Sequence, residues 1–193
     1  MSVSYIINSI FNSITYIVPI GNHSDCWLVD CGDVDKVIEK GWNIKGVFLT
    51  HAHFDHIYGL NRLLEMVPDA EIYTNVCGKE ALINPKQNFS RYHEETGDFV
   101  LSVVDNVSVI NNDDIIEIDS DVFVNVIETP GHDPSCLSYK IGNNLFTGDS
   151  YIPGIKVVTN FPRSNKQQAL ESLENLKQIE AEGCIVHCGH HSY

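Results

Sequence analysis

Short apolar runs separated by turn-forming residues dominate the first third of the chain. Residues 14–20 and 26–31 are rich in Ile, Val and aromatic side chains, and the GNHSD segment between them is typical of a turn. Residues 46–50 form a more continuous apolar run, which indicates a buried strand. A short helix is expected at residues 34–40, because Gly41 is a natural helix end. The pattern therefore predicts strands that alternate with at least one helix.

A helical spacing of apolar residues follows position 56. It predicts one helix whose inner face carries Ile57, Leu60, Leu63, Leu64 and Val67. Pro68 ends that helix, and residues 71–74 are expected to form another strand. Residues 84–99 have no regular period. A long irregular segment of this kind is often a lid or a substrate loop, and a plain surface excursion is an equal alternative.

The second half of the chain again runs strands first and helix last. Strands are expected at residues 107–110, 114–118, 122–128, 136–141 and 144–147. The last two are joined by Gly142-Asn143, a strong two-residue hairpin signal. Ser164 and Gln167 form a capping box, and the helix after them carries a stripe of Leu170, Leu173, Leu176 and Ile179. Residues 184–187 are expected to form a final, buried strand.

This order of elements predicts the fold class. Two runs of strands, each followed by a helix, suit two packed sheets with helices outside them. No low-complexity tract or Pro/Gly-rich linker divides the 193 residues. We therefore interpret the chain as a single α/β domain that spans residues 1–193.

Composition and charge exclude several function classes. A hydrophobic content of 43% is typical of a globular protein with a substantial core. The net charge of −14, from 12 basic and 26 acidic residues, argues against a nucleic-acid surface, which needs clustered Lys and Arg. No uninterrupted apolar stretch of about 18 residues predicts a membrane span. Residues 1–20 lack the Lys or Arg of a signal peptide, and the six cysteines form no CxxC pair, so a cytoplasmic protein with reduced thiols is expected.

Four residues of metal-ligand type fall within the HAHFDH segment: His51, His53, Asp55 and His56. His and Asp are rarely buried unless something pairs with them. Side chains alternate along an extended chain, so His51 and His53 can point to the same side where a strand ends. Asp55 and His56 fall where the chain turns into a helix, and a sharp bend could bring them back toward the first two. The alternative is that Asp55 caps the helix and the histidines are surface loop residues.

Three further strand ends carry a residue of the same kind. TPGH places His132 on a loop after a strand, FTGDS does so for Asp149, and CGH does so for His190. In each segment a Gly or Pro turns the chain beside a residue of ligand type. One such event is common, but three of them beside the four-residue cluster indicate a metal site.

HAHFDH, TPGH, FTGDS and CGH, in this order, resemble the motifs of the metallo-β-lactamase-fold hydrolase superfamily. The resemblance runs through nearly the whole chain, and the HxHxDH motif is highly specific. It implies a four-layer αββα sandwich of two mixed β-sheets flanked by helices, with a two-metal site at one edge of the sheets. The ligand set is similar to that of glyoxalase-II-like thioesterases, whose helical C-terminal domain has no counterpart after Tyr193; this argues against glutathione thioesters.

The resemblance also implies how the ligands divide between two metals. One metal would be held by His51, His53 and His132, the other by Asp55, His56 and His190, with Asp149 bridging. His187 and His191 compete with His190, and the family pattern favours the histidine that follows Gly189. Seven ligands are too many for one tetrahedral ion and suit two ions with open positions. Mixed imidazole and carboxylate ligation fits two Zn²⁺ first, with iron or manganese as alternatives.

By the same resemblance the protein is expected to be a metal-dependent hydrolase. A hydroxide that bridges the metals would attack an ester-like bond, a thioester or lactone in the first place, while Asp55 and Asp149 fix the water and the metals. A small-molecule substrate is expected, without nucleic acid or a membrane, and the oligomeric state is left open. The alternatives are a mononuclear iron sulfur or persulfide dioxygenase, a phosphodiesterase, and a non-catalytic metal-binding protein.

Several residues near the motifs keep two interpretations. Asp30 is either the partner of a ligand histidine or a simple turn residue. His187 is expected to be buried or to support a ligand, and His191 to be exposed. Roles for Cys31 and Cys188 near the metals stay open. Tyr151 could bind substrate or pack in the core, whereas His23 and His93 are expected to be solvated loop residues.

Overall fold

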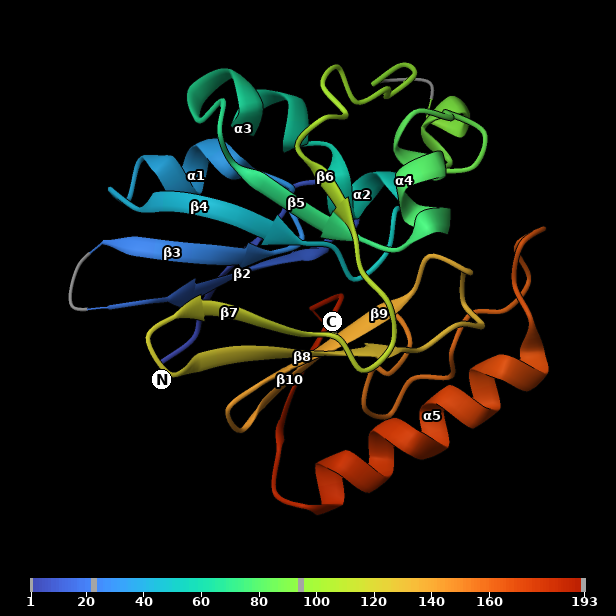
Figure 1. Cartoon of the computed structure of the whole chain (residues 1–193). Helices are drawn as coiled ribbons and strands as arrows, with labels where there is room; N and C mark the ends of the chain where they lie inside the picture. The colour runs from blue at the N-terminus through green and yellow to red at the C-terminus, as the bar shows by residue number, and fades with distance from the viewer. Residues whose placement is uncertain (1, 22–23, 94–95, 192–193) are drawn as a thin grey trace.

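Two β-sheets packed face to face form the centre of the computed structural model, which describes residues 2–21, 24–93 and 96–191 (Figure 1). The first sheet has the order β1-β2-β3-β4-β5-β6, formed by β1 (Ser4–Ile7), β2 (Ile14–Pro19), β3 (Asp25–Val29), β4 (Asn43–Phe48), β5 (Glu71–Thr74) and β6 (Val107–Val109). The second has the order β11-β10-β9-β8-β7, formed by β11 (Ile185–Cys188), β10 (Asn144–Gly148), β9 (Leu137–Ile141), β8 (Val122–Glu128) and β7 (Ile115–Asp119).

Helices cover the outer faces of both sheets (Figure 1). The helices α1 (Val34–Ile38) and α3 (Leu60–Met66) lie on the first sheet, and α5 (Lys166–Ala181) lies on the second. Three short elements complete the set: α2 (Phe54–Ile57), α4 (Val76–Leu82) and the 3-10 helix η1 (Ser90–Tyr92). Within the described ranges, no helix has both the length and the apolar character needed to cross a bilayer. The order helix, sheet, sheet, helix confirms the four-layer αββα sandwich.

Three apolar clusters fill the spaces between the layers. Val47 and Leu63 belong to the cluster between the first sheet and its helices. Phe48 and Tyr139 belong to the cluster between the two sheets, and Leu176 belongs to a third cluster under α5. Neighbouring residues of a strand point to opposite faces, so Val47 and Phe48 enter different clusters. Both faces of β4 are therefore buried, which explains why its second half reads as a continuous apolar run.

Strand direction brings the motif segments to one edge of the sandwich. β3 and β4 are parallel neighbours, so the segments that follow them emerge on the same side. In the second sheet β8 and β10 are both antiparallel to β9, and β11 is parallel to β10, so these three strands also end at one edge. Backbone hydrogen bonds join the two edges: Leu137 N donates to Thr50 O (2.7 Å) and Ile14 N donates to Gly189 O (2.8 Å).

The prediction of a single helix over residues 57–67 was wrong, because Gly59 separates α2 from α3. Gly59 N donates to Cys31 O (2.9 Å), which places this turn directly on the loop after β3. A Cβ at position 59 would lie 2.0 Å from the carbonyl oxygen of Gly32. The close approach therefore requires glycine, and it ties the start of α3 to the first sheet.

The N-terminus of α5 also differs from the expectation. The capping residue is Asn165, whose side chain accepts hydrogen bonds from the backbone nitrogens of Gln167 and Gln168. The Ser164 hydroxyl instead donates to His132 O (2.6 Å), so the predicted capping box was wrong. The apolar stripe is narrower than predicted, because Leu170 is 55% exposed. The helix thus starts one residue later, and the freed serine holds the loop that carries His132.

Two other elements differ from the sequence pattern. β11 is only half-buried, because it is the outer strand of its sheet, so the expectation of a buried strand was wrong. α4 was not expected at all. Its N-terminus is capped by Asn75, whose side chain accepts from Gly78 N, but the helix that follows spans only seven residues, which is too short to show a helical period.

We expect Leu176→Ala to lower the free energy of unfolding by about 2 to 5 kcal/mol, because this fully buried side chain fills the space under α5. The matched variant Leu170→Ala, on the exposed side of the same helix, should change it by less than about 0.5 kcal/mol. Urea unfolding followed by circular dichroism measures both values. Equal losses in the two variants would contradict the packing of α5.

Candidate metal site

The first sheet supplies four residues of the site from one continuous segment. β4 ends at Phe48, and five residues later His53, which has an extended backbone conformation, is the N-cap of α2. Asp55 and His56 lie in the first turn of that helix and are both buried. Phe54 N donates to Asn88 O (2.8 Å), which fixes the start of the helix. The bend expected from the sequence is this extended-to-helix transition at His53.

The second sheet supplies the other three residues from three strand ends. His132 follows β8, Asp149 follows β10 and His190 follows β11. The backbone at Gly189 passes close to Asp149, since a Cβ there would lie 2.2 Å from Asp149 Oδ1. Glycine in CGH therefore allows the last strand end to approach the carboxylate.

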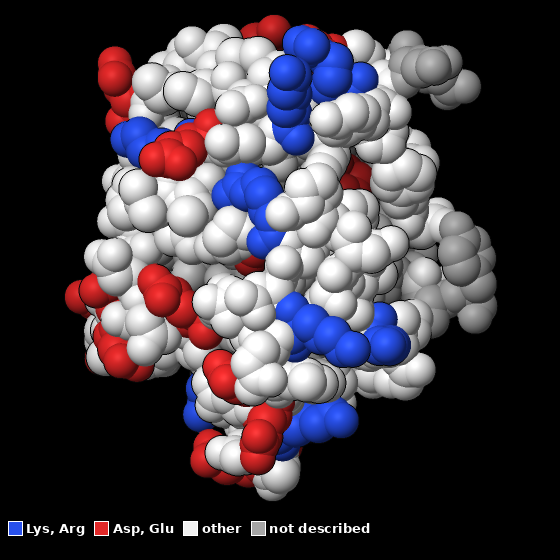
Figure 2. All heavy atoms as spheres, turned by 90° about the vertical axis from the view of Figure 1, so that its right-hand side faces the viewer, with Lys and Arg blue, Asp and Glu red and all other residues white. Residues whose placement is uncertain are grey.

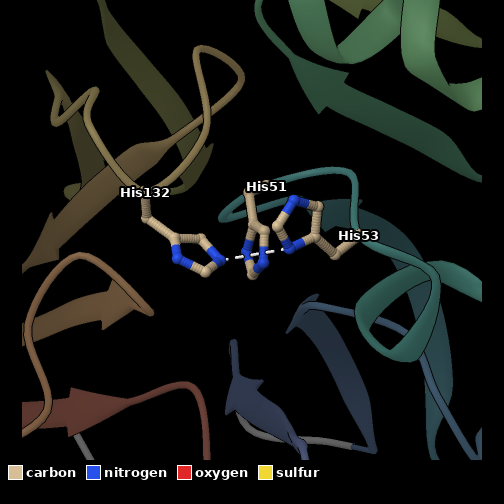
Figure 3. A group of neighbouring side chains, drawn as sticks. All are labelled: His51, His53 and His132. Carbon is tan, nitrogen blue, oxygen red and sulfur yellow. Dashed lines mark hydrogen bonds between the residues drawn. The ribbon is translucent and has the colours of Figure 1, made fainter. Parts of the chain in front are cut away.

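The structure brings all seven sequence-predicted residues together in three overlapping groups. In each group the donor atoms lie within 4.8 Å of one another. The groups are His51, His53 and His132 (Figure 3); His51, His56 and Asp149; and Asp55, His56 and His190. In Figure 3 the three imidazoles point toward a common centre, with His132 from one sheet facing His51 and His53 from the other. The shared residues make the groups one continuous cluster.

Hydrogen bonds on the far side of the rings set which nitrogen faces the cluster. His132 Nδ1 donates to Val158 O (2.9 Å), and His190 Nδ1 donates to Phe11 O (3.0 Å). A carbonyl oxygen only accepts, so each Nδ1 carries the proton. In the neutral ring the other nitrogen, Nε2, then presents its lone pair to the cluster.

Asp30 performs the same function for two more rings. Its carboxylate accepts from His56 Nδ1 (2.8 Å), Thr50 Oγ1 (2.7 Å) and Thr50 N (2.7 Å). The Thr50 hydroxyl donates its one hydrogen to Asp30, so toward His51 it can only accept, and it accepts from His51 Nδ1 at 3.2 Å. The structure therefore places Asp30 as the partner of a ligand-type histidine, one of the two interpretations that the sequence left open.

Buried atoms in the cluster have no hydrogen-bond partner of their own. Within the described residues, His51 Nε2 and Asp149 Oδ1 are both buried and unpaired. His56 Nε2 and His190 Nε2 lie 3.3 Å apart, and two facing lone pairs repel unless a proton or a cation lies between them. Unpaired buried donors and acceptors are rare in proteins, so this pattern fits a site that receives a cation.

The charges of the cluster also suit a divalent cation. Burial and the neighbouring imidazoles lower the pKa of His51 well below its usual value, so the ring is neutral at pH 7. Burial opposes ionisation of Asp149, but the His190 ring, 3.3 Å from its Oδ2, and the nearby imidazoles of His56 and His51 outweigh it, and the pKa of Asp149 falls well below its usual value. Neutral imidazoles and carboxylates together are the donors that zinc, iron and manganese accept.

Sequence reasoning missed one pair of residues beside the cluster. Asp133 is buried, and its Oδ2 lies 3.7 Å from His53 Nε2 and 3.5 Å from Arg163 Nε. Arg163 also donates to Gln87 Oε1 (3.1 Å), in the segment over residues 84–99. An acidic residue directly after His132 was the only available signal, because the contact joins three distant segments.

Five residues of the cluster line a cavity of about 600 Å³: His53, Asp55, His132, Asp149 and His190. The wall contains Phe89, Tyr92 and His93 from residues 84–99, which favours the substrate-loop interpretation of that segment over a plain surface excursion. His93 packs against Phe11 and Phe54, so the expectation of a simple solvated loop residue was wrong.

The remaining candidates lie outside the cavity. His187 Nε2 donates to Asn144 Oδ1 (2.9 Å) and the ring stacks on Phe146, while His191 is exposed. Tyr151 donates to Glu180 Oε2 (2.7 Å) on α5, which favours packing over substrate binding. The thiols of Cys31 and Cys188 have a raised pKa because they are buried, so neither is a thiolate at neutral pH. His23 lies outside the described residues.

Comparison with known proteins is consistent with this geometry. The family model of the metallo-beta-lactamase superfamily matches residues 12–190. A hydroxyacylglutathione hydrolase of Hydrogenovibrio crunogenus is 27% identical over 185 residues, which are 91% of this chain and 58% of that protein. The chain thus spans less than two thirds of the length of this curated relative.

Two solved structures share the fold over nearly the whole chain. The BLEG-1 B3 metallo-beta-lactamase has a TM-score of 0.87 at 22% identity, covering 99% of this chain and 92% of the other. TTHA1623 in a di-iron-bound form has a TM-score of 0.81 at 21% identity, covering 98% and 92%. At this level of identity the likeness shows the fold alone.

We expect Asp30→Asn to weaken metal binding by about ten- to a hundredfold. An amide cannot accept from the three donors that surround Asp30, so one orientation forces His56 into the tautomer whose Nε2 carries the proton. Competition with a chromophoric chelator measures the affinity. Asp33→Asn, on the same loop but hydrogen-bonded to Ser9 and Tyr58, is the control and should bind metal like the wild type. Equal affinities for both variants would contradict the role of Asp30.

Proposed function

Because the chain belongs to the metallo-beta-lactamase superfamily, we propose that it is a metal-dependent hydrolase of an ester-like bond, in the first place a thioester. The single observation that carries this proposal is the convergence of seven His and Asp side chains, five of which line an open cavity. The printed name of the Hydrogenovibrio relative, a hydrolase of hydroxyacylglutathione, supports a thioester.

The proposed ligand assignment follows the three groups of donor atoms. His51, His53 and His132 would hold one cation, and Asp55, His56 and His190 a second. Asp149 lies between the two sets: its Oδ2 is 3.6 Å from His132 Nε2 and 3.3 Å from His190 Nε2. This supports a carboxylate shared by both cations. Zinc is proposed first, with iron or manganese as alternatives, because imidazole and carboxylate suit all three.

Bound divalent cations would lower the pKa of water to about 7 and polarise the substrate carbonyl. The protein's own contribution is to hold the donors and the substrate. Asp55 and Asp149 are carboxylates next to the reacting position, so they accept hydrogen bonds from water and orient it. In the reaction the water oxygen bonds to the acyl carbon, the C–S bond breaks, and the products are an acid and a thiol. Within the described wall of the cavity no Ser or Cys is present to act as a nucleophile instead.

The surface supports a small-molecule substrate rather than a nucleic acid. Figure 2 shows Lys and Arg in separate groups on the face that includes α5, with acidic and uncharged residues between them, not in a continuous basic band. The net charge of −14 points the same way. A location in the cytoplasm remains part of the proposal.

We expect Asp149→Ala to lose bound metal and to lower kcat/KM for a thioester by at least about a thousandfold, because this carboxylate lies between both donor sets. The fold should persist, since Asp149 is at the edge of the sheets. Mass spectrometry of metal content, circular dichroism and thioesterase assays measure the three properties.

The neighbouring pair His190 and His191 supplies a matched test of the ligand assignment. His190→Ala should reduce the metal content, whereas His191→Ala, with an exposed ring outside the cluster, should keep the wild-type content and rate. Removal of metal with a chelator should abolish turnover, and added Zn²⁺ should restore it. Full activity of the chelated protein or of Asp149→Ala would refute the proposed function.

A further inference from the structure

The wall of the cavity is formed mainly by aromatic rings. Phe11, Phe54, Phe89, Tyr92 and Phe161 all line it. Two of them are strongly exposed, Phe11 at 59% and Tyr92 at 65%. Single exposed aromatic residues are ordinary. Several of them around one cluster of His and Asp form an apolar surface from which a bound ligand would displace water.

Two of these rings are held by strained backbone. Phe11 has a φ of 53° and Phe89 a φ of 65°, and only six described non-glycine residues have a positive φ. For a bulky side chain this conformation is unfavourable and persists only where the surroundings enforce it. Such strain concentrates at functional sites, and here both strained phenylalanines point to the same cavity.

Specific hydrogen bonds enforce both conformations. The Phe11 carbonyl accepts from His190 Nδ1 (3.0 Å), so this residue holds a ligand-type histidine with its backbone and lines the cavity with its ring. Phe89 follows Asn88, whose buried side chain donates to Ala81 O and Phe99 O. The wall is therefore built in advance and is not a loose surface.

The innermost rings contact the ligand histidines directly. The centroid of Phe89 lies 4.8 Å and that of Phe161 lies 5.4 Å from the His53 ring, and the two phenylalanines are 5.0 Å apart. Phe161 also lies 5.5 Å from His132. A group attached to the reacting carbon would therefore meet these rings first.

Counter-charges for an anionic substrate do not line the cavity. Among the described lining residues there is no Lys or Arg. Two arginines in the segments that form the wall are engaged elsewhere: Arg163 lies against Asp133 and Gln87, and Arg91 pairs with Asp98. A substrate with several carboxylates would place them on an apolar wall without partners.

We propose that this cavity selects uncharged thioesters or esters that carry an aromatic acyl group. The selecting residues are the aromatic wall, with Phe89 and Phe161 next to the reacting bond. The proposal rests on the proposed hydrolase function, because it assigns the substrate class for the same site.

Binding of unreactive ligands tests the cavity without any turnover. The metal-loaded protein is titrated by calorimetry with two thioethers of N-acetylcysteamine, S-(3-phenylpropyl) and S-propyl, which lack the thioester carbonyl that would be hydrolysed. We expect the phenyl compound to bind at least about tenfold more tightly, because contact with the wall removes the apolar surface of the phenyl ring from water. Equal affinities would overturn the proposal.

Matched aromatic variants locate the preference. Phe161→Ala should reduce the affinity ratio of the two thioethers at least about threefold. The control is Phe123→Ala, an exposed phenylalanine of β8 outside the cavity wall, which should keep the wild-type ratio. Metal content is measured in both, so that loss of the cation is not mistaken for loss of the wall. An unchanged ratio in metal-loaded Phe161→Ala would refute the role of the ring.

Turnover separates the two proposals. We expect the 3-phenylpropionyl thioester of N-acetylcysteamine to have a kcat/KM at least about tenfold above that of the same acyl group on glutathione, whose carboxylates meet no cation. A higher rate with glutathione would overturn the uncharged substrate class. If no thioester is hydrolysed but the phenyl thioether still binds more tightly, the hydrolase function fails and the aromatic cavity stands.

Discussion

The buried carboxylate of Asp30 is the interaction on which the geometry of the site depends. It lies directly after β3, with a φ of 61°, and accepts hydrogen bonds from Thr50 on the next strand end and from His56 on α2. One carboxylate thus fixes the orientation of two rings, directly for His56 and through the Thr50 hydroxyl for His51. Asp tolerates the left-handed conformation better than a bulky residue does, so the strain at this turn is modest. The other His and Asp residues of the cluster therefore face two rings whose orientation is fixed.

The seven clustered residues were predictable because their positions depend on strand ends. Parallel neighbours end on the same side of a sheet, and each motif follows directly after a strand that the apolar pattern identifies. An error of two residues in a strand boundary does not alter which segment follows it. The clustering of these residues was therefore predictable although details nearby were wrong, such as the division of the helix at Gly59 and the cap at Asn165.

The wall of the cavity could not be predicted, because its residues have no common motif. Phe11 lies in a tight turn between β1 and β2, and Phe161 lies about 150 positions further along the chain. Their proximity to the His and Asp cluster follows from the packing of the two sheets and, for Phe11, from a positive φ angle that a phenylalanine in the sequence does not indicate. Asp133 and Arg163 were missed for the same reason. A charged residue next to a motif is expected to be solvated, and only the folded chain shows that its partner comes from another segment.

Phe11 shows why the cluster and the cavity cannot vary independently. Its carbonyl holds His190, and its ring forms part of the wall, so any backbone change that moved the ring would also release the histidine. Ser13, two residues later, donates its hydroxyl to Asp55 O (2.7 Å) and pairs with His190 across the two sheets. The turn over residues 8–13 therefore contacts two residues of one donor group as well as the cavity. The strained conformation of Phe11 persists only while these contacts hold it, and this couples the shape of the apolar wall to the position of His190 and Asp55.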